Sequence, residues 1–484
     1  MTNKISILPL TRLEGHGKVE IILDDAGGVT DAYFQVTEFR GFEKFCEGRQ
    51  VEELPRITPK ICGICAGAHH LASAKACDAV YGVEVPQAAK RLREVFLNAH
   101  IAHSHILHFF LLGMPDLALG EEGKRQRNVF GLAGRFGKEI GEAACDSRGY
   151  AQRIQEIIGG HPIYPVSALP GGLSKPLGEE DRAEIEKMAL SLMEFSQMSL
   201  ELFESVVLKD ERLLELLTGD LYREETHYAG MVDRENKVNF YDGRVRVVDP
   251  AGKEVCIFEG SAYLEHIAEH VEPWSYLKFP YLKGVGWKGF VDGPESGVYR
   301  VSSLARLNAA DGMATPLAQE AYQKLYSFFG KKPVHNTLAY HWARLVELLC
   351  ASERILQLAR DPQITDNLVR NVPQAKPAAG VGVVEAPQGT LYHHYVTDRK
   401  GMVQQVNLIV ATVQNNAAIN LSVRNVARQL IKNGAVDEKL LNMVEMAVRA
   451  YDPCLACASH LLPGKAPVAI RIYRGGELWQ KLIR

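Results

Sequence analysis

Two pairs of cysteines are the residues of this sequence best suited to metal chemistry. Two residues separate Cys62 from Cys65, the same spacing separates Cys454 from Cys457, and a histidine closely follows each pair. This spacing lets neighbouring thiolates converge on one metal ion. Four thiolates are soft ligands that suit zinc, copper(I), an iron-sulfur cluster, or low-valent nickel and iron, and the spacing does not choose among these metals.

A structural zinc site made of four cysteines is the simplest alternative. Structural zinc usually joins a short local segment, whereas these pairs lie near opposite ends of a chain of 484 residues. If the pairs share a metal, the two ends of the chain must meet in the core. The nine cysteines make a poor disulfide framework. Five of them are expected to pack as small apolar residues, namely Cys46, Cys77, Cys145, Cys256 and Cys350.

The elements that must position the cysteines are mainly helical. Apolar periodicity predicts helices over residues 88–112, 179–217, 316–329, 338–359 and 437–450. Strand-like alternation predicts two hairpins, one pairing residues 18–23 with 29–36 and one pairing 238–241 with 245–248. The apolar stretch 106–114 is shorter than the roughly 20 residues that cross a bilayer, so we expect a core helix and no membrane span. The sequence therefore predicts a predominantly helical α+β fold with small peripheral sheets.

Composition and charge narrow the class of protein further. The chain is 46% hydrophobic and 23% charged, with a formal net charge of -3 and no long run of one sign. Binding to nucleic acid is not expected, because it needs a basic face. Residues 1–21 lack the features of a signal peptide, which predicts a cytoplasmic protein. Without a linker or repeat, residues 1–460 are expected to form a single intertwined unit.

Longer motifs surround both cysteine pairs. The first reads Cys62-Gly-Ile-Cys65-Ala-Gly-Ala-His69, and the second reads Asp452-Pro-Cys454-Leu-Ala-Cys457-Ala-Ser-His460. Five more motifs accompany them: Arg12-Leu-Glu14-Gly-His16, Arg40-Gly-Phe-Glu43-Lys, His103-Ser-His105-Ile-Leu-His108-Phe-Phe, Pro170-Gly-Gly-Leu173 and Glu385-Ala-Pro-Gln388-Gly. In this order, and over essentially the whole chain, the motifs resemble the large (alpha) subunit of nickel-iron hydrogenases. Two features, His103-Ser104-His105 and the paired His393-His394, resemble the cytoplasmic group of this family. That group includes methyl-viologen-reducing, heterodisulfide-reductase-linked and NAD-linked enzymes.

The resemblance implies a fold, an activity and a metal centre. The implied reaction is the reversible heterolytic oxidation of hydrogen to protons and electrons. Cys62 and Cys454 would be terminal ligands of nickel, while Cys65 and Cys457 would bridge nickel to an iron that carries carbon monoxide and cyanide. Splitting hydrogen needs a metal and a nearby base, and the resemblance gives the role of base to Cys454.

The resemblance also assigns roles to residues around the cysteines. Glu14 would carry the proton outward, which needs a buried carboxyl with a pKa near neutrality. His69 would donate a hydrogen bond towards the bridging thiolates. Residue 388 would lie over the open face of the metals, and Asp452 and Pro387 would contact the cofactor.

A second metal site is implied near the end of the motif-bearing region. Glu43, His460 and a backbone carbonyl near Leu408 would hold magnesium, or a second iron, with water completing the coordination. The four histidines of helix 88–112 are instead expected to be satisfied core residues or to support the ligands of the metal, although histidines that are three residues apart lie on one face of the helix. These are His100, His103, His105 and His108.

Partners and processing follow from the resemblance as well. Electrons would pass to a small subunit that carries iron-sulfur clusters, and from there to a further electron-transfer subunit, which could be heterodisulfide reductase. Ferredoxin, NAD(P) or a deazaflavin remain alternative acceptors, because no dinucleotide-binding or flavin motif is present in this chain. Residues 461–484 resemble the extension that a maturation endopeptidase removes after nickel insertion.

Two positions depart from the pattern of the family. Gln388 stands where the family usually has arginine, which removes a fixed positive charge from the site. Lys60 replaces the arginine that usually precedes the first cysteine motif, but it keeps the charge. The change at position 388 motivates an alternative function, a non-catalytic or retuned scaffold or sensor.

Overall fold

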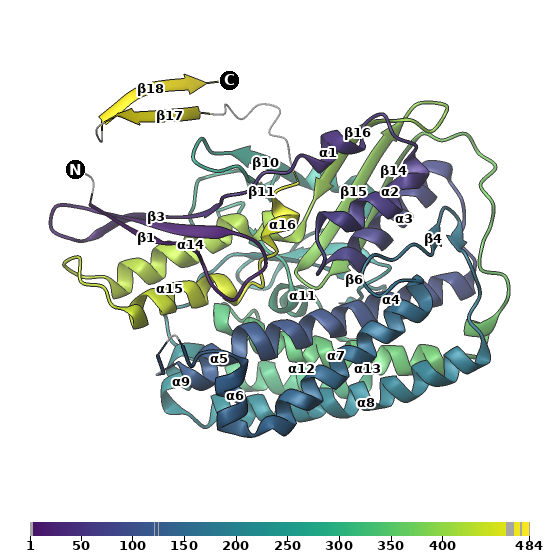
Figure 1. Ribbon diagram of the computed structural model, residues 1–484, viewed down its shortest axis with the longest axis horizontal. Helices are drawn as coiled ribbons and strands as arrows, with labels where there is room; N and C mark the ends of the chain where they lie inside the picture. Colours follow the sequence, from purple (N-terminus) through teal and green to yellow (C-terminus); the bar gives the residue numbers. More distant parts are fainter. Residues whose placement is uncertain (1–2, 121, 124, 461–468, 475–476, 484) are drawn as a thin grey trace.

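A bundle of long helices forms one layer of the molecule (Figure 1). The computed structural model describes residues 3–120, 122–123, 125–460, 469–474 and 477–483. Five helices pack side by side in the bundle, namely α4 (Gln87–Ile106), α7 (Lys138–Gly159), α8 (Glu179–Phe203), α12 (Pro316–Phe329) and α13 (Tyr340–Ala359). The expected α+β fold class, with many helices and small sheets, is confirmed.

The predicted helix 88–112 is a core helix, as expected. Helix α4 ends at Ile106, and the chain continues as a π-helix over Leu107–Gly113 and as α5 over Met114–Leu119. The stretch Gln87–Leu119 is long and apolar enough to cross a membrane, but 83% of its most apolar window is buried inside the protein. Its apolar side chains are therefore covered by the fold itself.

The predicted helix 179–217 is wrong as one element. Helix α8 ends at Phe203, a π-helical turn covers Glu204–Leu208, and α9 begins again at Glu211–Thr218. The carboxylate of Asp210 accepts a hydrogen bond from the backbone N–H of Leu213 at 3.0 Å. A capping aspartate of this kind starts a new helix. Residue 437 likewise caps the last predicted helix, α15 (Glu438–Arg449).

One of the two predicted hairpins is confirmed. Strands β2 (Gly17–Leu23) and β3 (Val29–Val36) pair antiparallel, and β1 (Asn3–Ile7) joins them. The second hairpin is wrong, because β7 (Lys237–Val238) and β8 (Arg244–Val248) lie on opposite sides of β6 (His227–Val232). Every residue of β6 is buried, so this strand takes the central position that the turn alone could not predict.

A three-stranded sheet and one helix carry much of the candidate site. The sheet has the order β14-β15-β16, formed by Ala379–Ala386, Gly389–Thr397 and Val403–Ile409. Helix α3 (Ala66–Tyr81) lies against β14 and β15. The approach is close, because a Cβ atom at Gly382 would lie 2.1 Å from the carbonyl oxygen of Ala72. Residue 382 must therefore lack a side chain.

The two ends of the chain meet in the core. The backbone N–H of Leu455 donates to the carbonyl of Glu14 at 3.1 Å, and the N–H of Arg40 donates to the carbonyl of Ser459 at 2.7 Å. Figure 1 places α16 (Leu455–Ala458) between the N-terminal strands and the β14–β16 sheet. One continuous cluster of buried apolar side chains includes residues from Ile7 to Ala458.

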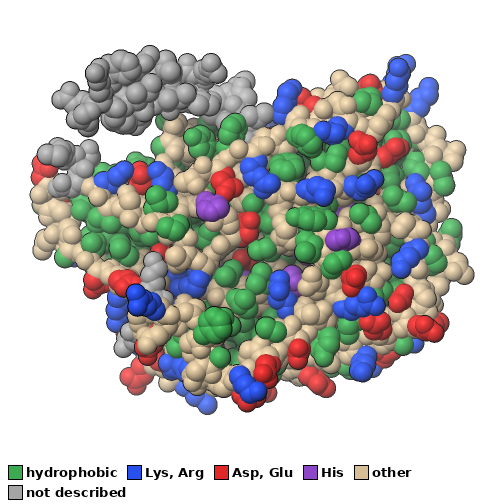
Figure 2. All heavy atoms as spheres, viewed as in Figure 1, with side chains coloured by type: hydrophobic (Ala, Val, Ile, Leu, Met, Phe, Trp, Pro, Cys, Tyr) green, Lys and Arg blue, Asp and Glu red, His purple; other side chains and the backbone are tan. Residues whose placement is uncertain are grey.

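The C-terminal extension is described only from residue 469. Strands β17 (Ala469–Arg474) and β18 (Glu477–Ile483) pair antiparallel, whereas the predicted cleavage point after His460 adjoins residues 461–468, which lie outside the described part of the chain. On the face shown in Figure 2, charged side chains of both signs are interspersed, in keeping with the small net charge.

All nine cysteines are free thiols. Cys46, Cys77 and Cys350 are buried, and Cys256 is half-buried, as expected for small apolar residues. The expectation is wrong for Cys145, which is exposed on the outward side of α7 because that amphipathic helix buries its other face.

Candidate metal centre

The four motif cysteines form one buried cluster. Among the residues that the structure describes, theirs is the one set of three or more cysteine, histidine or acidic side chains able to hold a metal ion, with all four sulfurs within 4.8 Å of one another. The sulfur of Cys454 lies 3.2 Å from that of Cys62 and 2.9 Å from that of Cys457. The fold therefore brings the two ends of the chain to one point suited to a soft metal ion.

Short elements place each sulfur. Cys65 is the residue from which α3 begins, and Cys457 lies within α16. Cys454 is extended, and its backbone N–H donates to Oγ1 of Thr412 at 2.9 Å. The N–H of Ile64 donates to the sulfur of Cys62 at 3.3 Å, which favours a thiolate there.

The cluster favours a negative charge on one of its sulfurs. Hydrogen bonds from the thiols of Cys454, Cys457 and Cys65 hold the pKa of the Cys62 thiol well below its ordinary value. Burial raises the pKa of Cys454 and of Cys457 well above the ordinary value. Binding of a divalent metal supplies the positive charge that lets such thiols ionise together.

Glu14 contacts the cluster from the N-terminal side. Its Oε2 atom lies 3.1 Å from the sulfur of Cys454 and accepts a hydrogen bond from the backbone N–H of Ala456 at 3.0 Å. Burial, reinforced by the charge of Cys62, raises the pKa of Glu14 to about 7. A carboxyl with this pKa exchanges protons readily at neutral pH.

Gln388 lies in the turn between β14 and β15 and contacts the cluster through Cys65. Its Oε1 atom accepts a hydrogen bond from the thiol of Cys65 at 3.3 Å. Its Nε2 atom donates to Oδ2 of Asp452 at 2.9 Å and to Oγ of Ser104 at 3.3 Å. Burial raises the pKa of Asp452 to about 7, partly opposed by the charge of Arg344 and by the Gln388 amide. The oxygen of the amide is therefore held by Cys65, and its nitrogen is held by Asp452 and Ser104.

Pro387 is placed by a buried arginine. Its carbonyl accepts hydrogen bonds from Nη2 of Arg306 at 3.0 Å and from Oγ of Ser302 at 3.3 Å. The same guanidinium is paired with Glu347 and Glu385, and all three side chains are fully buried. Arg306 thus fixes the turn between β14 and β15 on which Gln388 lies.

His69 reaches the cluster from α3. Its Nε2 atom lies 3.4 Å from the sulfur of Cys457, and its Nδ1 atom lies 3.0 Å from Nε2 of His393. Of the paired histidines in β15, only His393 faces the site. His394 points to the other side of the strand, where its Nδ1 atom contacts the hydroxyl of Tyr263 at 3.1 Å.

The residues of the expected second metal site also come together. Oε1 of Glu43 accepts a hydrogen bond from the backbone N–H of Leu408 at 2.7 Å and lies 3.7 Å from Nε2 of His460. That nitrogen donates to the carbonyl of Leu408 at 2.8 Å. Burial raises the pKa of Glu43 to about 7. A carboxylate, a carbonyl and an imidazole are a donor set that fits a hard divalent cation with added water.

Three of the four histidines of α4 and the following π-helix have hydrogen-bond partners outside the cluster, whereas the buried Nε2 atom of His103 has none among the described residues. The expectation of a satisfied core histidine is therefore not met at His103. Nδ1 of His100 lies 3.0 Å from Oε1 of Gln155, and Nε2 of His105 lies 2.9 Å from Oε2 of Glu347. Nε2 of His108 donates to the carbonyl of Arg449 at 2.8 Å. Burial lowers the pKa of His105 to about 4, so it packs as a neutral side chain.

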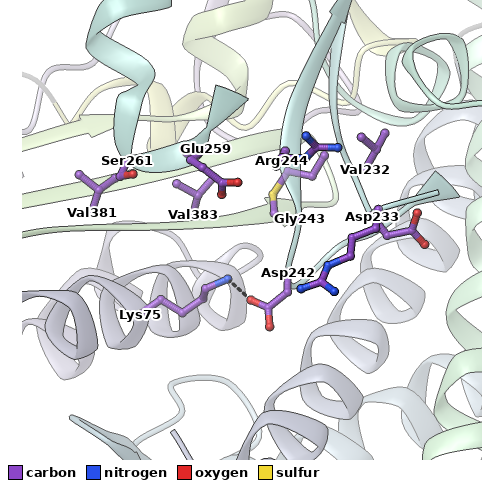
Figure 3. Close-up of a pocket in the computed structure, with 13 residues that line it drawn as sticks. Lys75, Val232, Asp233, Asp242, Gly243, Arg244, Glu259, Ser261, Val381 and Val383 are labelled. Atoms are coloured by element: carbon purple, nitrogen blue, oxygen red, sulfur yellow. Dashed lines mark hydrogen bonds and ion pairs between the residues drawn. The ribbon is translucent and has the colours of Figure 1, made fainter. Parts of the chain in front are cut away.

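A large surface pocket lies away from the cysteine cluster (Figure 3). Its volume is about 740 Å³, and none of the residues predicted for the metal sites lines it. Lys75 and Asp242, which form an ion pair at 2.8 Å, lie on its wall together with Arg244 and Glu259. Mixed charges on an open wall carry no chemistry comparable to that of the sulfur cluster.

Several residues that build the site were missed in the sequence. Ser104 lies inside a motif, but its spacing gave no sign that its hydroxyl would meet Gln388. Thr412 and Arg306 lie outside the motifs and carry no local signal, because their partners are distant in the sequence. The donor set as a whole fits a nickel-iron pair, since four buried sulfurs converge and a carboxyl reaches one of them.

Comparison with known proteins gives a consistent result. The family described as nickel-dependent hydrogenase matches residues 40–118 and 296–460, and a family described as HoxL-like matches residues 4–39. An iron-sulfur subunit of the F420-non-reducing hydrogenase from Archaeoglobus profundus is 49% identical over 98% of this chain and 98% of its own length. The beta subunit of the NAD-reducing hydrogenase HoxS from Cupriavidus necator is 36% identical over 98% of each chain.

Solved structures show the same fold. A crystal structure of an NAD+-reducing [NiFe]-hydrogenase in the H2-reduced state covers 95% of this chain and 100% of its own, with a TM-score of 0.89 and 38% identity. A [NiFeSe]-hydrogenase from Dm. baculatum has a TM-score of 0.74 at 21% identity, which supports the fold alone.

Proposed function

The chain belongs to the nickel-dependent hydrogenase family, and from this membership we propose how its own residues serve the reaction. It is a catalytic large subunit, an oxidoreductase that acts on hydrogen, of a family that depends on nickel. We propose that its four cysteines hold nickel and iron. One observation carries the proposed roles. Four buried sulfurs lie within 4.8 Å of one another, and a carboxyl oxygen lies 3.1 Å from one of them.

Cys62 and Cys454 would hold nickel, and Cys65 and Cys457 would help to hold both nickel and an iron that carries carbon monoxide and cyanide. When bound, the metal pair supplies the site at which hydrogen is split into protons and an electron pair. The sulfur of Cys454 accepts a proton, and Oε2 of Glu14 takes it on across the 3.1 Å contact. Glu14 suits this role because its pKa is about 7.

In this proposal, Asp452 orients the side-chain amide of Gln388 beside the cluster. The amide spans from the sulfur of Cys65 to the carboxyl of Asp452 and is buried, so water does not compete for its hydrogen bonds. The alternative function, a non-catalytic scaffold or sensor, is not favoured by any observation over catalysis. Relatives that match nearly the whole chain are named as hydrogenase subunits.

Magnesium is proposed for the second site. Glu43, the carbonyl of Leu408 and His460 would bind it with waters, replacing the direct hydrogen bond from His460 to Leu408. A second iron is the alternative occupant. Either ion would join the C-terminal motif to the N-terminal segment, since Glu43 and His460 come from opposite ends of the chain.

The electrons released from hydrogen must pass to an acceptor. The relatives are named as subunits of multi-subunit hydrogenases, and we propose that a small subunit with iron-sulfur clusters is the direct acceptor. A further electron-transfer subunit, such as heterodisulfide reductase, would follow. The name F420-non-reducing of several relatives makes a deazaflavin acceptor the weaker alternative.

Maturation and location complete the proposal. Residues 1–460 act as one catalytic unit in the cytoplasm, and an endopeptidase removes residues 461–484 after nickel insertion. The proposal is supported by the position of His460, which is buried beside Cys457 and Leu408. Mass spectrometry of the active complex is expected to find a large subunit that ends at His460.

Metal analysis and infrared spectroscopy of the chain, purified with its partner, test the function directly. We expect nickel, iron and the stretching bands of metal-bound cyanide and carbon monoxide. Cys62→Ser is expected to abolish the bands, whereas Cys256→Ser, outside the cluster, should keep them. Zinc alone, without these bands, would contradict the proposal.

A further inference from the structure

A line of hydrogen-bonding side chains continues from His69 into the protein interior. Nδ1 of His69 lies 3.0 Å from Nε2 of His393, and Nδ1 of His393 lies 2.6 Å from the hydroxyl of Tyr395. That hydroxyl lies 2.8 Å from Oγ of Ser73. The line begins at the sulfur of Cys457, 3.4 Å from Nε2 of His69.

The line is formed where one face of a helix meets one face of a strand. His69 and Ser73 are one turn apart on α3, so their side chains lie on the same face. His393 and Tyr395 alternate along β15 and point to the same side of the sheet. Helix α3 packs on this sheet, as Figure 1 shows. The four side chains meet one another at this contact.

The line is shielded from bulk solvent. His69 is 1% exposed, and His393, Tyr395 and Ser73 are completely buried. Each polar atom must therefore find its partner among these neighbours. Among the described residues, the hydrogen-bond partners of the two rings are a sulfur, each other and a hydroxyl. Burial of a charge without a carboxylate partner is unfavourable, so both rings are neutral. A neutral imidazole has one N–H and one bare nitrogen.

If Cys457 binds a metal, only one donor-to-acceptor direction is possible along this line of hydrogen bonds. A bound cysteine is a thiolate and can only accept a hydrogen bond. His69 must then carry its proton on Nε2, so its bare Nδ1 accepts from Nε2–H of His393. The bare Nδ1 of His393 in turn accepts from the hydroxyl of Tyr395. The hydroxyl of Tyr395, which otherwise donates to Oγ of Ser73 at 2.8 Å, then turns its hydrogen to His393.

We propose that Tyr395, acting through His393, fixes the tautomer of His69 and so maintains N–H donation to the sulfur of Cys457. His393 and Tyr395 are positioning residues, because neither touches a metal ligand. The inference rests on the proposed function only in that Cys457 must bind metal. Donation of a hydrogen bond withdraws electron density from a sulfur shared with iron, so the line tunes the electron density of the iron.

Tyr395→Phe tests the inference in the purified complex with its partner subunit. Without the phenol, Nδ1 of His393 has no donor, so His393 and then His69 are released to the other tautomer. Infrared spectroscopy should then show a component of the metal-bound carbon monoxide band at lower wavenumber. A more electron-rich iron donates more electron density into the carbon monoxide and weakens its bond. Tyr392→Phe is the matched control. Its hydroxyl is also buried in β15 but has no hydrogen-bond partner among the described residues.

A second substitution separates tautomer control from simple loss of packing. The side-chain amide of His69→Gln carries a permanent N–H donor, so its donation does not depend on His393. Tyr395→Phe should therefore add no further band shift in the His69→Gln background. An unshifted band in Tyr395→Phe, or an equal shift in both backgrounds, would overturn the inference. Absence of carbonyl and cyanide bands from the unsubstituted complex would instead contradict the proposed function.

Discussion

Glu14 is half-buried and Asp452 is buried beside the cysteine cluster, and loss of solvent raises the pKa of each carboxyl to about 7. The two carboxyls have different hydrogen-bond partners, and these partners suit them to different roles. Glu14 contacts a sulfur directly, whereas Asp452 accepts its hydrogen bond from the amide of Gln388. A carboxyl that touches the proton-accepting atom can carry a proton, and one that is bonded to an amide orients that amide.

Glu14→Gln keeps an acceptor for the N–H of Ala456 but cannot exchange a proton. We expect turnover to fall by about 100- to 10,000-fold, with nickel and iron contents unchanged. In the unsubstituted enzyme, turnover should be highest near pH 7 if this transfer limits the rate. Below its pKa the carboxyl of Glu14 holds a proton and cannot accept another, and above it the carboxylate has none to donate. Hydrogen-uptake assays across pH measure both effects, and full activity of the variant would show that the proton leaves by another route.

The site accommodates the neutral side chain of Gln388. Its oxygen and nitrogen are both engaged, and Ser104 supplies a hydroxyl beside it. Gln388→Leu leaves Asp452 without its donor, which costs about 1–3 kcal/mol, and turnover should fall by roughly ten- to a hundredfold.

Gln388→Arg should also lower turnover, because the larger guanidinium overfills a packed site at a cost of about 1–3 kcal/mol. Hydrogen uptake per nickel measures both substitutions. A large rise with arginine would mean that glutamine impairs the site.

Helix α3 is the element on which most of the site depends. Cys65 immediately precedes the helix and His69 lies within it, and the helix packs directly on the backbone of β14 at Gly382. A shift of this helix would move a metal ligand and its hydrogen-bond donor together. Close packing between a helix and a glycine-bearing strand is therefore part of the metal site, although the glycine lies outside the cysteine motifs.

Gly382→Ala places a methyl group 2.1 Å from the carbonyl oxygen of Ala72, and the helix must move. We expect a lower melting temperature and a loss of nickel, both measured on the purified complex. Gly141→Ala on α7 is the control, since a Cβ atom there meets nothing within 4 Å. That helix should be stabilised by up to about 1 kcal/mol. If Gly382→Ala kept full nickel, α3 would not be fixed by this contact.

At the scale of the whole molecule, the metal ions would link the two ends of the chain. Glu14 and Glu43 come from the N-terminal segment, and they meet Cys454 and His460 from the other end. The protein contributes hydrogen bonds at the same place, between Arg40 and Ser459 among others. Metals bound here would hold these ends together more strongly than such bonds alone, because they bind only the folded arrangement.

Protein made without nickel should therefore melt at a lower temperature than the loaded protein. The difference should disappear in Cys454→Ser, which cannot complete the centre in either case. Differential scanning calorimetry on matched preparations measures it. Equal melting temperatures for loaded and nickel-free protein would mean that hydrogen bonds alone hold the ends together.

The sequence alone predicted the parts of the molecule that depend on local chemistry. The spacing of the cysteine pairs predicted that four sulfurs could converge, and the structure brings them together. Apolar periodicity predicted α12 with its observed bounds, and the motifs predicted the family. Local patterns could not predict the break at Asp210 or the place of β6 between β7 and β8. The first depends on one capping bond, and the second depends on which strand is most buried.

Only the tertiary structure decided the neighbours that tune the site. Ser104 and Arg306 contact residues far away in the sequence, and so do Tyr395 and Ser73, which contact each other. No spacing rule points to these contacts. The same holds for the raised pKa of Glu14, which arises from burial and from the charge of Cys62. Ligand type is a property of a residue and its close neighbours, whereas burial and hydrogen-bond partners exist only once distant segments have packed together.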